Sequence, residues 1–188
     1  MKWNDHSNIE GTHAFLSPSK HAWLNYDKEK LEEVYRSMMA KERGTRLHEF
    51  ASECIKMRQK LPRQHITFNM FVNDAIGYDM DSEIPLFYSY SCYGTADAIK
   101  YDSKKKILRI HDLKTGKTPA SMSQLETYAA LFCLEYDITP NELNLIELRI
   151  YQNDEVFVEV PEPDLISYIM GKIIEASAII EEVQREYY

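Results

Sequence analysis

The sequence predicts an α/β fold, and three observations lead to that expectation. Segments with apolar residues at helical spacing alternate along the chain with short runs typical of strands. Residues 94–117 contain two such runs around a polar turn at 102–105, the pattern of a hairpin. The length of 188 residues and the hydrophobic content of 44% suit a buried core. We therefore expect a single domain over residues 1–188, or one domain with an extension.

The N-terminal third is predicted to be helical. Ser17 and Pro18 mark a helix start, because proline is tolerated at the first helical position. Apolar residues at helical spacing then predict two helices, over residues 27–41 and 45–60, with an interruption at Gly44.

Four strand-like runs follow, over residues 66–72, 84–90, 95–101 and 106–113. In the last of them the side chains alternate between two faces, because a strand repeats every two residues. One face carries Leu108, Ile110, Asp112 and Lys114, and the other carries Ile107, Arg109 and His111.

The C-terminal part begins with a helix over residues 118–136, with Thr118 as the N-cap and proline next. Strands are predicted over 143–151 and 155–160, around an Asn-Asp turn. An apolar stripe at helical spacing predicts a last helix over 163–185.

Charge is distributed unevenly. The net charge of −8 argues against a generic nucleic-acid binder. However, residues 36–63 hold eight Lys or Arg against three Glu, and residues 100–117 hold seven against two Asp. Residues 135–188 hold thirteen acids against three bases. The two basic segments fit a phosphate ligand, with ordinary solvated helix and turn faces as the alternative.

Cys54, Cys92 and Cys133 lie far apart and form no C-x-x-C pair. Three cysteines are too few for a four-cysteine zinc or iron–sulfur site, and we expect small buried side chains. No run reaches the roughly 18 apolar residues of a membrane span, and the first residues lack the apolar core of a signal peptide. We expect a cytoplasmic protein without a membrane partner.

A candidate site emerges at the predicted hairpin. Asp112 and Lys114 should project side by side from a strand end, with Asp97 on the neighbouring strand. Two carboxylates and a lysine at a sheet edge could bind a divalent cation beside a water. A bare D-x-K is more often a strand-end cap with a solvated lysine, so the surrounding residues decide.

Two other motifs fail. Lys114-Thr115-Gly116-Lys117-Thr118 ends like a phosphate-binding P-loop, but position 111 is histidine instead of the required glycine. His48-Glu49 begins like a helical zinc protease motif, but the second histidine is replaced by Ser52.

The remaining elements form an ordered set: GTRLH on a helix, GTADA on a strand, HDLKTGK at the end of the next strand, and Q-x-x-x-Y on a helix. This set resembles the PD-(D/E)XK nuclease superfamily, and most of all its RecB-like branch, which includes phage-encoded exonucleases. The resemblance covers about residues 44–134. It implies a mixed central sheet flanked by helices, with a restriction-endonuclease-like core.

The resemblance also implies roles for the matching residues. The implied metal ligands are His48, Asp97, Asp112 and the backbone carbonyl of Leu113. Lys114 would position or activate the attacking water, while Gln124 and Tyr128 would support the site and contact DNA. Glu83 matches an additional acid of some members. Three departures are Ala96 in place of a proline, Asp in place of Glu at position 112, and the missing iron–sulfur cysteines.

The implied function is hydrolysis of DNA phosphodiester bonds with Mg²⁺ or Mn²⁺, most simply by an exonuclease of phage recombination or DNA processing. The metal would polarise the phosphoryl oxygen and lower the pKa of water. DNA is the implied partner, with a recombination or processing protein as a second. RNA hydrolysis, and a catalytically inactive module that binds DNA or a protein, are the alternatives.

Overall fold

The computed structural model describes residues 14–187, which divide into two compact units. The first unit ends at Thr45, and the second begins at Arg46 and contains the whole sheet. The helix α1 (Lys28–Lys56) passes through this boundary. Each unit is described by itself.

The first unit contains the 3-10 helix η2 (Pro18–Asn25) and the N-terminal part of α1. Pro18 occupies the first helical position, as expected, but the Ser17 hydroxyl contacts Ser19 Oγ and caps no backbone N–H. Asp27 Oδ1 accepts the N–H of Lys30 at 2.8 Å, which satisfies one free donor at the start of α1.

The predicted interruption at Gly44 is wrong, because α1 is continuous over that residue. One glycine costs a helix interior only about 1 kcal/mol relative to alanine, which a long helix tolerates. The next residue, Thr45, returns its hydroxyl to the carbonyl of Lys41 at 3.3 Å instead of ending the helix.

The second unit is built on a five-stranded mixed sheet in the order β1-β2-β3-β4-β5. The strands are β1 (Asp81–Ser89), β2 (Cys92–Asp102), β3 (Ile107–Leu113), β4 (Leu145–Gln152) and β5 (Glu155–Glu159). Only β3 and β4 pair in parallel, and the other neighbours are antiparallel. The expected α/β class with a mixed sheet and flanking helices is confirmed.

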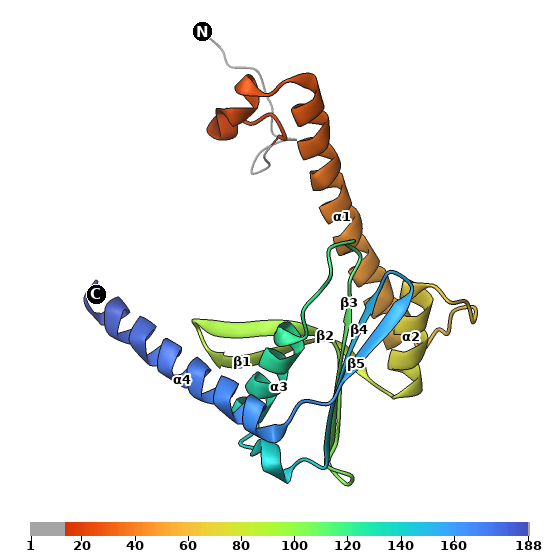
Figure 1. The fold of residues 1–188 in the computed structure, drawn as a ribbon, viewed down its shortest axis with the longest axis vertical. Coiled ribbons are helices and arrows are strands. Elements are labelled where there is room, and N and C mark those ends of the chain that lie inside the picture. The colour runs from red at the N-terminus through yellow and green to blue at the C-terminus, as the bar shows by residue number, and fades with distance from the viewer. Residues whose placement is uncertain (1–13, 188) are drawn as a thin grey trace, which may run out of the picture. The chain divides into compact units, whose positions relative to one another are not determined.

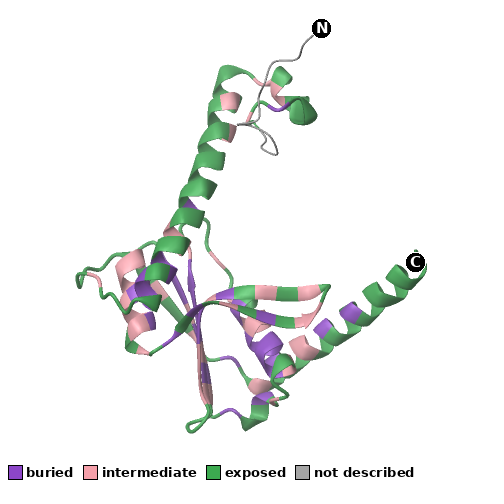
Figure 2. Cartoon of the chain, turned by 180° about the vertical axis from the view of Figure 1, so that it is seen from behind, coloured by how far each residue is buried: buried purple, intermediate pink, exposed green. Residues whose placement is uncertain are grey.

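Helices cover both faces of this sheet (Figure 1). The C-terminal part of α1 and α2 (Thr67–Gly77) enclose one core, which includes Ala51, Ile55, Phe71, Ala98 and Tyr151. On the other face α3 (Ser123–Glu135) and the first turns of α4 (Pro163–Arg185) enclose a larger core. The short 3-10 helix η3 (Pro140–Glu142) precedes β4. Figure 2 shows that the last turns of α4 are largely exposed.

The sequence predicts a strand over residues 66–72, and this prediction is wrong because residues 67–72 lie in α2 and Ile66 is its N-cap. Their β-branched and aromatic content suggested a strand, but Phe71, Val72 and Ala75 recur at helical spacing and are buried. The start of α2 is capped from a distant turn, since Asp154 Oδ1 accepts the N–H of Thr67 at 2.8 Å. The residues around Thr67 do not predict this cap, because Asp154 is distant in the sequence.

The predicted N-cap at Thr118 is also wrong, because α3 begins at Ser123. The side chain of Gln152 holds the preceding segment outside the helix. Its amide donates to the carbonyls of Gly116 and Thr118 at 2.6 and 2.8 Å, and its oxygen accepts the N–H of Ala120 at 3.1 Å. These three bonds replace the first helical turn.

Within residues 14–187 no helix is both long and apolar enough to span a membrane.

Candidate metal centre

The site begins where β2 and β3 separate. Their last paired residues are Ala98 and His111, so Asp97 and Asp112 would be the next opposite pair. Instead of continuing the ladder, Oδ2 of Asp97 accepts the backbone N–H of Leu113 at 2.8 Å. A carboxylate therefore replaces a strand partner at this end of the sheet.

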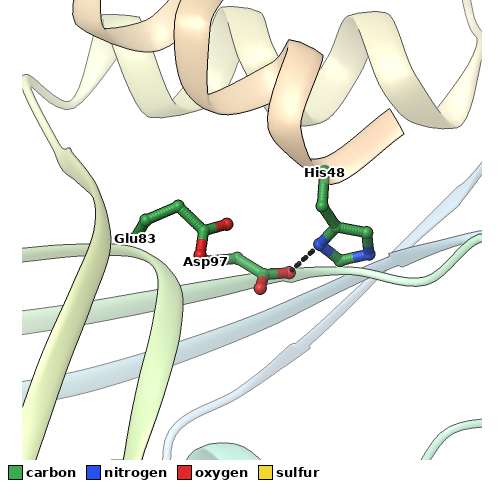
Figure 3. Close-up of side chains that lie close together, drawn as sticks. All are labelled: His48, Glu83 and Asp97. Carbon is green, nitrogen blue, oxygen red and sulfur yellow. Dashed lines mark ion pairs between the residues drawn. The ribbon is translucent and has the colours of Figure 1, made fainter. Parts of the chain in front are cut away.

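His48 reaches this carboxylate from α1. Its Nδ1 lies 3.2 Å from Asp97 Oδ2 (Figure 3). The helix is fixed here because Ala51, Cys54 and Ile55 are buried against the sheet, which turns His48 towards β2. The hydrogen bond to Asp97 raises the pKa of His48 against the opposing effect of burial, with further attraction from Asp97, Asp112 and Glu83.

Glu83 completes a group of three possible ligands. Ser82 pairs with Ala98 and Ile84 with Ala96, so Glu83 lies opposite Asp97 in the β1–β2 register. One ligand atom from each of His48, Glu83 and Asp97 lies within 4.8 Å of the others. Burial, and the nearby charge of Asp97, raise the pKa of Glu83. Its backbone is left-handed, with φ 54° inside a strand.

Asp112 and Lys114 form the adjacent part of the site. Lys114 Nζ donates to Asp112 Oδ1 at 3.1 Å and lies 2.9 Å from Oδ2, the second contact lacking hydrogen-bond geometry. Asp112 is buried, and this burial, reinforced by Asp97, raises the pKa of its carboxyl group despite the lysine.

A chain of polar contacts leads from Lys114 to α3. Lys114 Nζ donates to Gln124 Oε1 at 2.7 Å, and Gln124 Nε2 lies 3.5 Å from the hydroxyl of Tyr128. Tyr128 in turn lies against β2 at Gly94, where an added Cβ would be 2.8 Å from its Cε1. The absence of a side chain at position 94 therefore lets α3 approach the strand.

The predicted site residues are thus arranged in two adjoining groups. His48 and Asp97 lie together with Glu83, whereas Asp112 lies with Lys114, Gln124 and Tyr128. Leu113 contacts Asp97 through its N–H, while the resemblance assigned a role to its carbonyl. Glu83, only an additional match in the sequence, joins His48 and Asp97 by geometry as a third possible metal ligand.

A buried polar network lies beside the site, on the α2 face of the sheet. Tyr151 donates its hydroxyl proton to Asp74 at 2.7 Å, so its oxygen accepts from Nδ1 of His111 at 3.3 Å. Burial, and then the charges of Arg149 and Arg109, lower the pKa of His111 to about 3. His111 is therefore neutral near pH 7 and serves the packing of α2 against the sheet.

Chemically, the group formed by His48, Glu83 and Asp97 offers one imidazole nitrogen and two carboxylates to a cation. Carboxylates suit hard divalent ions, and an imidazole extends the range towards Mn²⁺ and other transition metals.

Comparison of the chain with protein-family models found no match, and comparison with curated proteins found none.

Proposed function

We propose that this chain is a metal-dependent nuclease that hydrolyses DNA phosphodiester bonds. The observation that supports this most is the convergence of His48, Glu83 and Asp97 next to the Asp112–Lys114 pair. Acids, an imidazole and a lysine from four separate elements meet where two strands part. This arrangement places possible ligands for a metal cation beside the positively charged side chain of Lys114.

The first group of residues would hold the metal. His48, Glu83 and Asp97 would supply its ligands. The buried Asp112 would be the next residue opposite Asp97 in the β2–β3 register. When bound, Mg²⁺ or Mn²⁺ supplies charge neutralisation for the phosphate and a more acidic water. Burial first, and the charge of Asp97 second, raise the pKa values of both Glu83 and Asp112, and a bound cation would offset both effects.

The second group would orient the attacking water. Lys114 is held between Asp112 and Gln124, so its ammonium group is fixed in direction. Its remaining N–H can hold the water oxygen in line with the phosphorus, and its charge favours the hydroxide form. Tyr128 secures Gln124 from the side of α3.

The finer assignments rest on the resemblance of the motifs. We propose a restriction-endonuclease-like core of the RecB-like type and exonuclease activity in phage recombination or DNA processing. We also propose a cytoplasmic setting, the compartment in which free thiols such as those of Cys54, Cys92 and Cys133 persist.

The decisive experiment is a cleavage time course on labelled DNA. The purified chain is incubated with 5′- and 3′-labelled linear and circular DNA, single- and double-stranded, and with RNA, in Mg²⁺, Mn²⁺ or EDTA. We expect metal-dependent cleavage that Asp112→Ala abolishes and that Asp164→Ala, an exposed acid on α4, leaves intact. Intact DNA in every metal with wild-type protein would overturn the proposal and favour a non-catalytic binding module.

A further inference from the structure

The hairpin of β1 and β2 has one covered face and one open face. Alternate side chains on a strand point to opposite faces. On the covered face Ile84, Leu86, Gly94 and Ala96 lie under α3 or in the core it encloses. The open face carries Glu83, Pro85 and Phe87 on β1 and, opposite them, Asp97, Thr95 and Tyr93 on β2. It is open at its outer end, whereas Asp97 at its inner end lies beside His48 of α1. Exposed stretches along this hairpin are visible in Figure 2.

Aromatic rings gather at the outer end of the open face. Phe87 is 43% exposed, Tyr93 67%, and Tyr90, in the turn, 93%. The rings of Phe87 and Tyr93 are stacked with centroids 6.3 Å apart, and Tyr90 meets Phe87 edge-on at 5.5 Å. Large rings that exposed are costly to leave in water, so a cluster of three indicates a binding surface.

This aromatic end is continuous with the candidate metal centre. The pair Glu83 and Asp97, the pair Pro85 and Thr95, and the pair Phe87 and Tyr93 follow one another on the same face. Four residues of strand separate the first pair from the last, which is about 13 Å. A ligand lying along the hairpin would touch the rings with one end and reach the metal ligands with the other.

The chemistry of the surface selects the ligand. Residues 84–96 contain no charged side chain, so this surface offers rings and few groups that pair with phosphate. Exposed rings bind unpaired nucleobases by stacking, whereas the bases of a duplex are already stacked internally. Resting on the proposed nuclease function, we propose that the open hairpin face holds a single-stranded segment of the substrate, with bases on Phe87, Tyr90 and Tyr93 and a phosphodiester at the metal centre.

The test is binding of fluorescent single-stranded oligonucleotides to the full chain in EDTA, measured by anisotropy. This assay needs no cleavage, so it can fail or succeed independently of the nuclease proposal. We expect Phe87→Ala and Tyr93→Ala each to weaken binding roughly tenfold. Tyr93→Phe should bind like wild type, and Tyr168→Ala, an exposed tyrosine on α4, serves as the matched control.

An oligonucleotide with abasic sites separates stacking from other contacts. This oligonucleotide keeps every phosphate but lacks the bases that would stack on the rings. The wild-type protein should therefore bind it weakly, and neither alanine substitution should weaken that binding further. The ratio of wild-type to variant affinity should also be similar at low and high salt, because stacking of a base on a ring releases no counterions. Circular dichroism on each variant verifies that the hairpin substitutions leave the fold intact.

Two results overturn the proposal. One is wild-type protein that binds single strands no better than duplex, and the other is a folded Phe87→Ala, Tyr93→Ala double variant with unchanged affinity for single strands. Either result combined with metal-dependent cleavage leaves the nuclease proposal standing and removes only the stacking surface. Ring-dependent binding without cleavage in any metal retains the surface and removes the nuclease.

Discussion

The backbone N–H of Leu113 donates a 2.8 Å hydrogen bond to Oδ2 of Asp97, the same oxygen that His48 Nδ1 approaches at 3.2 Å. Two donors from different elements therefore hold one carboxylate oxygen at the place where β2 leaves β3. Because Asp112 and Lys114 are the chain neighbours of Leu113, this contact fixes Asp97 relative to both and joins the two halves of the candidate site.

Replacing Glu83 with Gln should weaken metal binding and at the same time stabilise the metal-free protein. The pKa of Glu83 is raised, so its ionised form is disfavoured in the folded state and costs stability above that pKa. Loss of a ligand should reduce Mn²⁺ affinity by at least the roughly 10- to 100-fold typical of outer-shell changes. Calorimetric titration and metal-free thermal unfolding at pH 7 measure both effects. Unchanged Mn²⁺ affinity would remove Glu83 from the centre.

Replacing Lys114 with Met should slow cleavage on the order of 100-fold while metal affinity stays near that of wild type. In the proposed reaction the ammonium group orients the water and is no metal ligand, and in the structure it contacts Asp112 and Gln124. Gln124→Leu should give a smaller loss, because Gln124 acts through Lys114, and Gln124→Glu should restore part of the rate by again accepting the lysine N–H. Single-turnover rates at saturating Mn²⁺ measure each step, and equal rates in all four proteins would contradict this role.

Replacing Gly94 with Ala should destabilise the fold by about 1–3 kcal/mol, the usual cost of overpacking. The new Cβ would meet Tyr128 Cε1 at 2.8 Å. In the background Tyr128→Ala the same substitution should cost much less, since the ring that it strikes is gone. Urea unfolding of the two single variants and the double variant gives the coupling, and strictly additive effects would refute the contact.

His111 should make the protein less stable in acid. Its folded pKa of about 3 lies below the ordinary histidine value of 6.5, so the unfolded chain binds more protons between those values. The stability that neutral His111 contributes is complete above pH 6.5 and falls as the pH drops towards 3. The variant His111→Gln should therefore show a flatter fall in metal-free Tm between pH 7 and pH 4. An identical slope in both proteins would contradict the buried neutral state.

The spacing of residues in the sequence correctly predicts which side chains share a face in part of the sheet. Alternation in residues 106–113 put Leu108 and Ile110 on the face that packs under α3, and the same alternation brought Asp112 beside Lys114. Local patterns suffice there because strand periodicity and burial agree.

Long-range contacts account for what spacing missed. The cap of α2 comes from Asp154, and the start of α3 is delayed by Gln152, both distant in sequence. The partner of Asp97 was hidden by an irregularity between Phe87 and Ser89, which shifts the β1–β2 register by one residue. Counting back from the Tyr90-Ser91 turn would therefore pair Glu83 with Ala98 instead of Asp97. From the sequence, Glu83 is only an additional acid that the resemblance implies.

The left-handed backbone at Glu83 lowers the stability of the fold at a residue whose carboxylate is a possible metal ligand. A side chain at φ 54° costs of order 1–3 kcal/mol, which glycine would avoid. A design effort that selects this scaffold for heat resistance alone would favour Glu83→Gly. It would produce a more stable molecule without the carboxylate that lies beside His48 and Asp97, and so without one possible metal ligand.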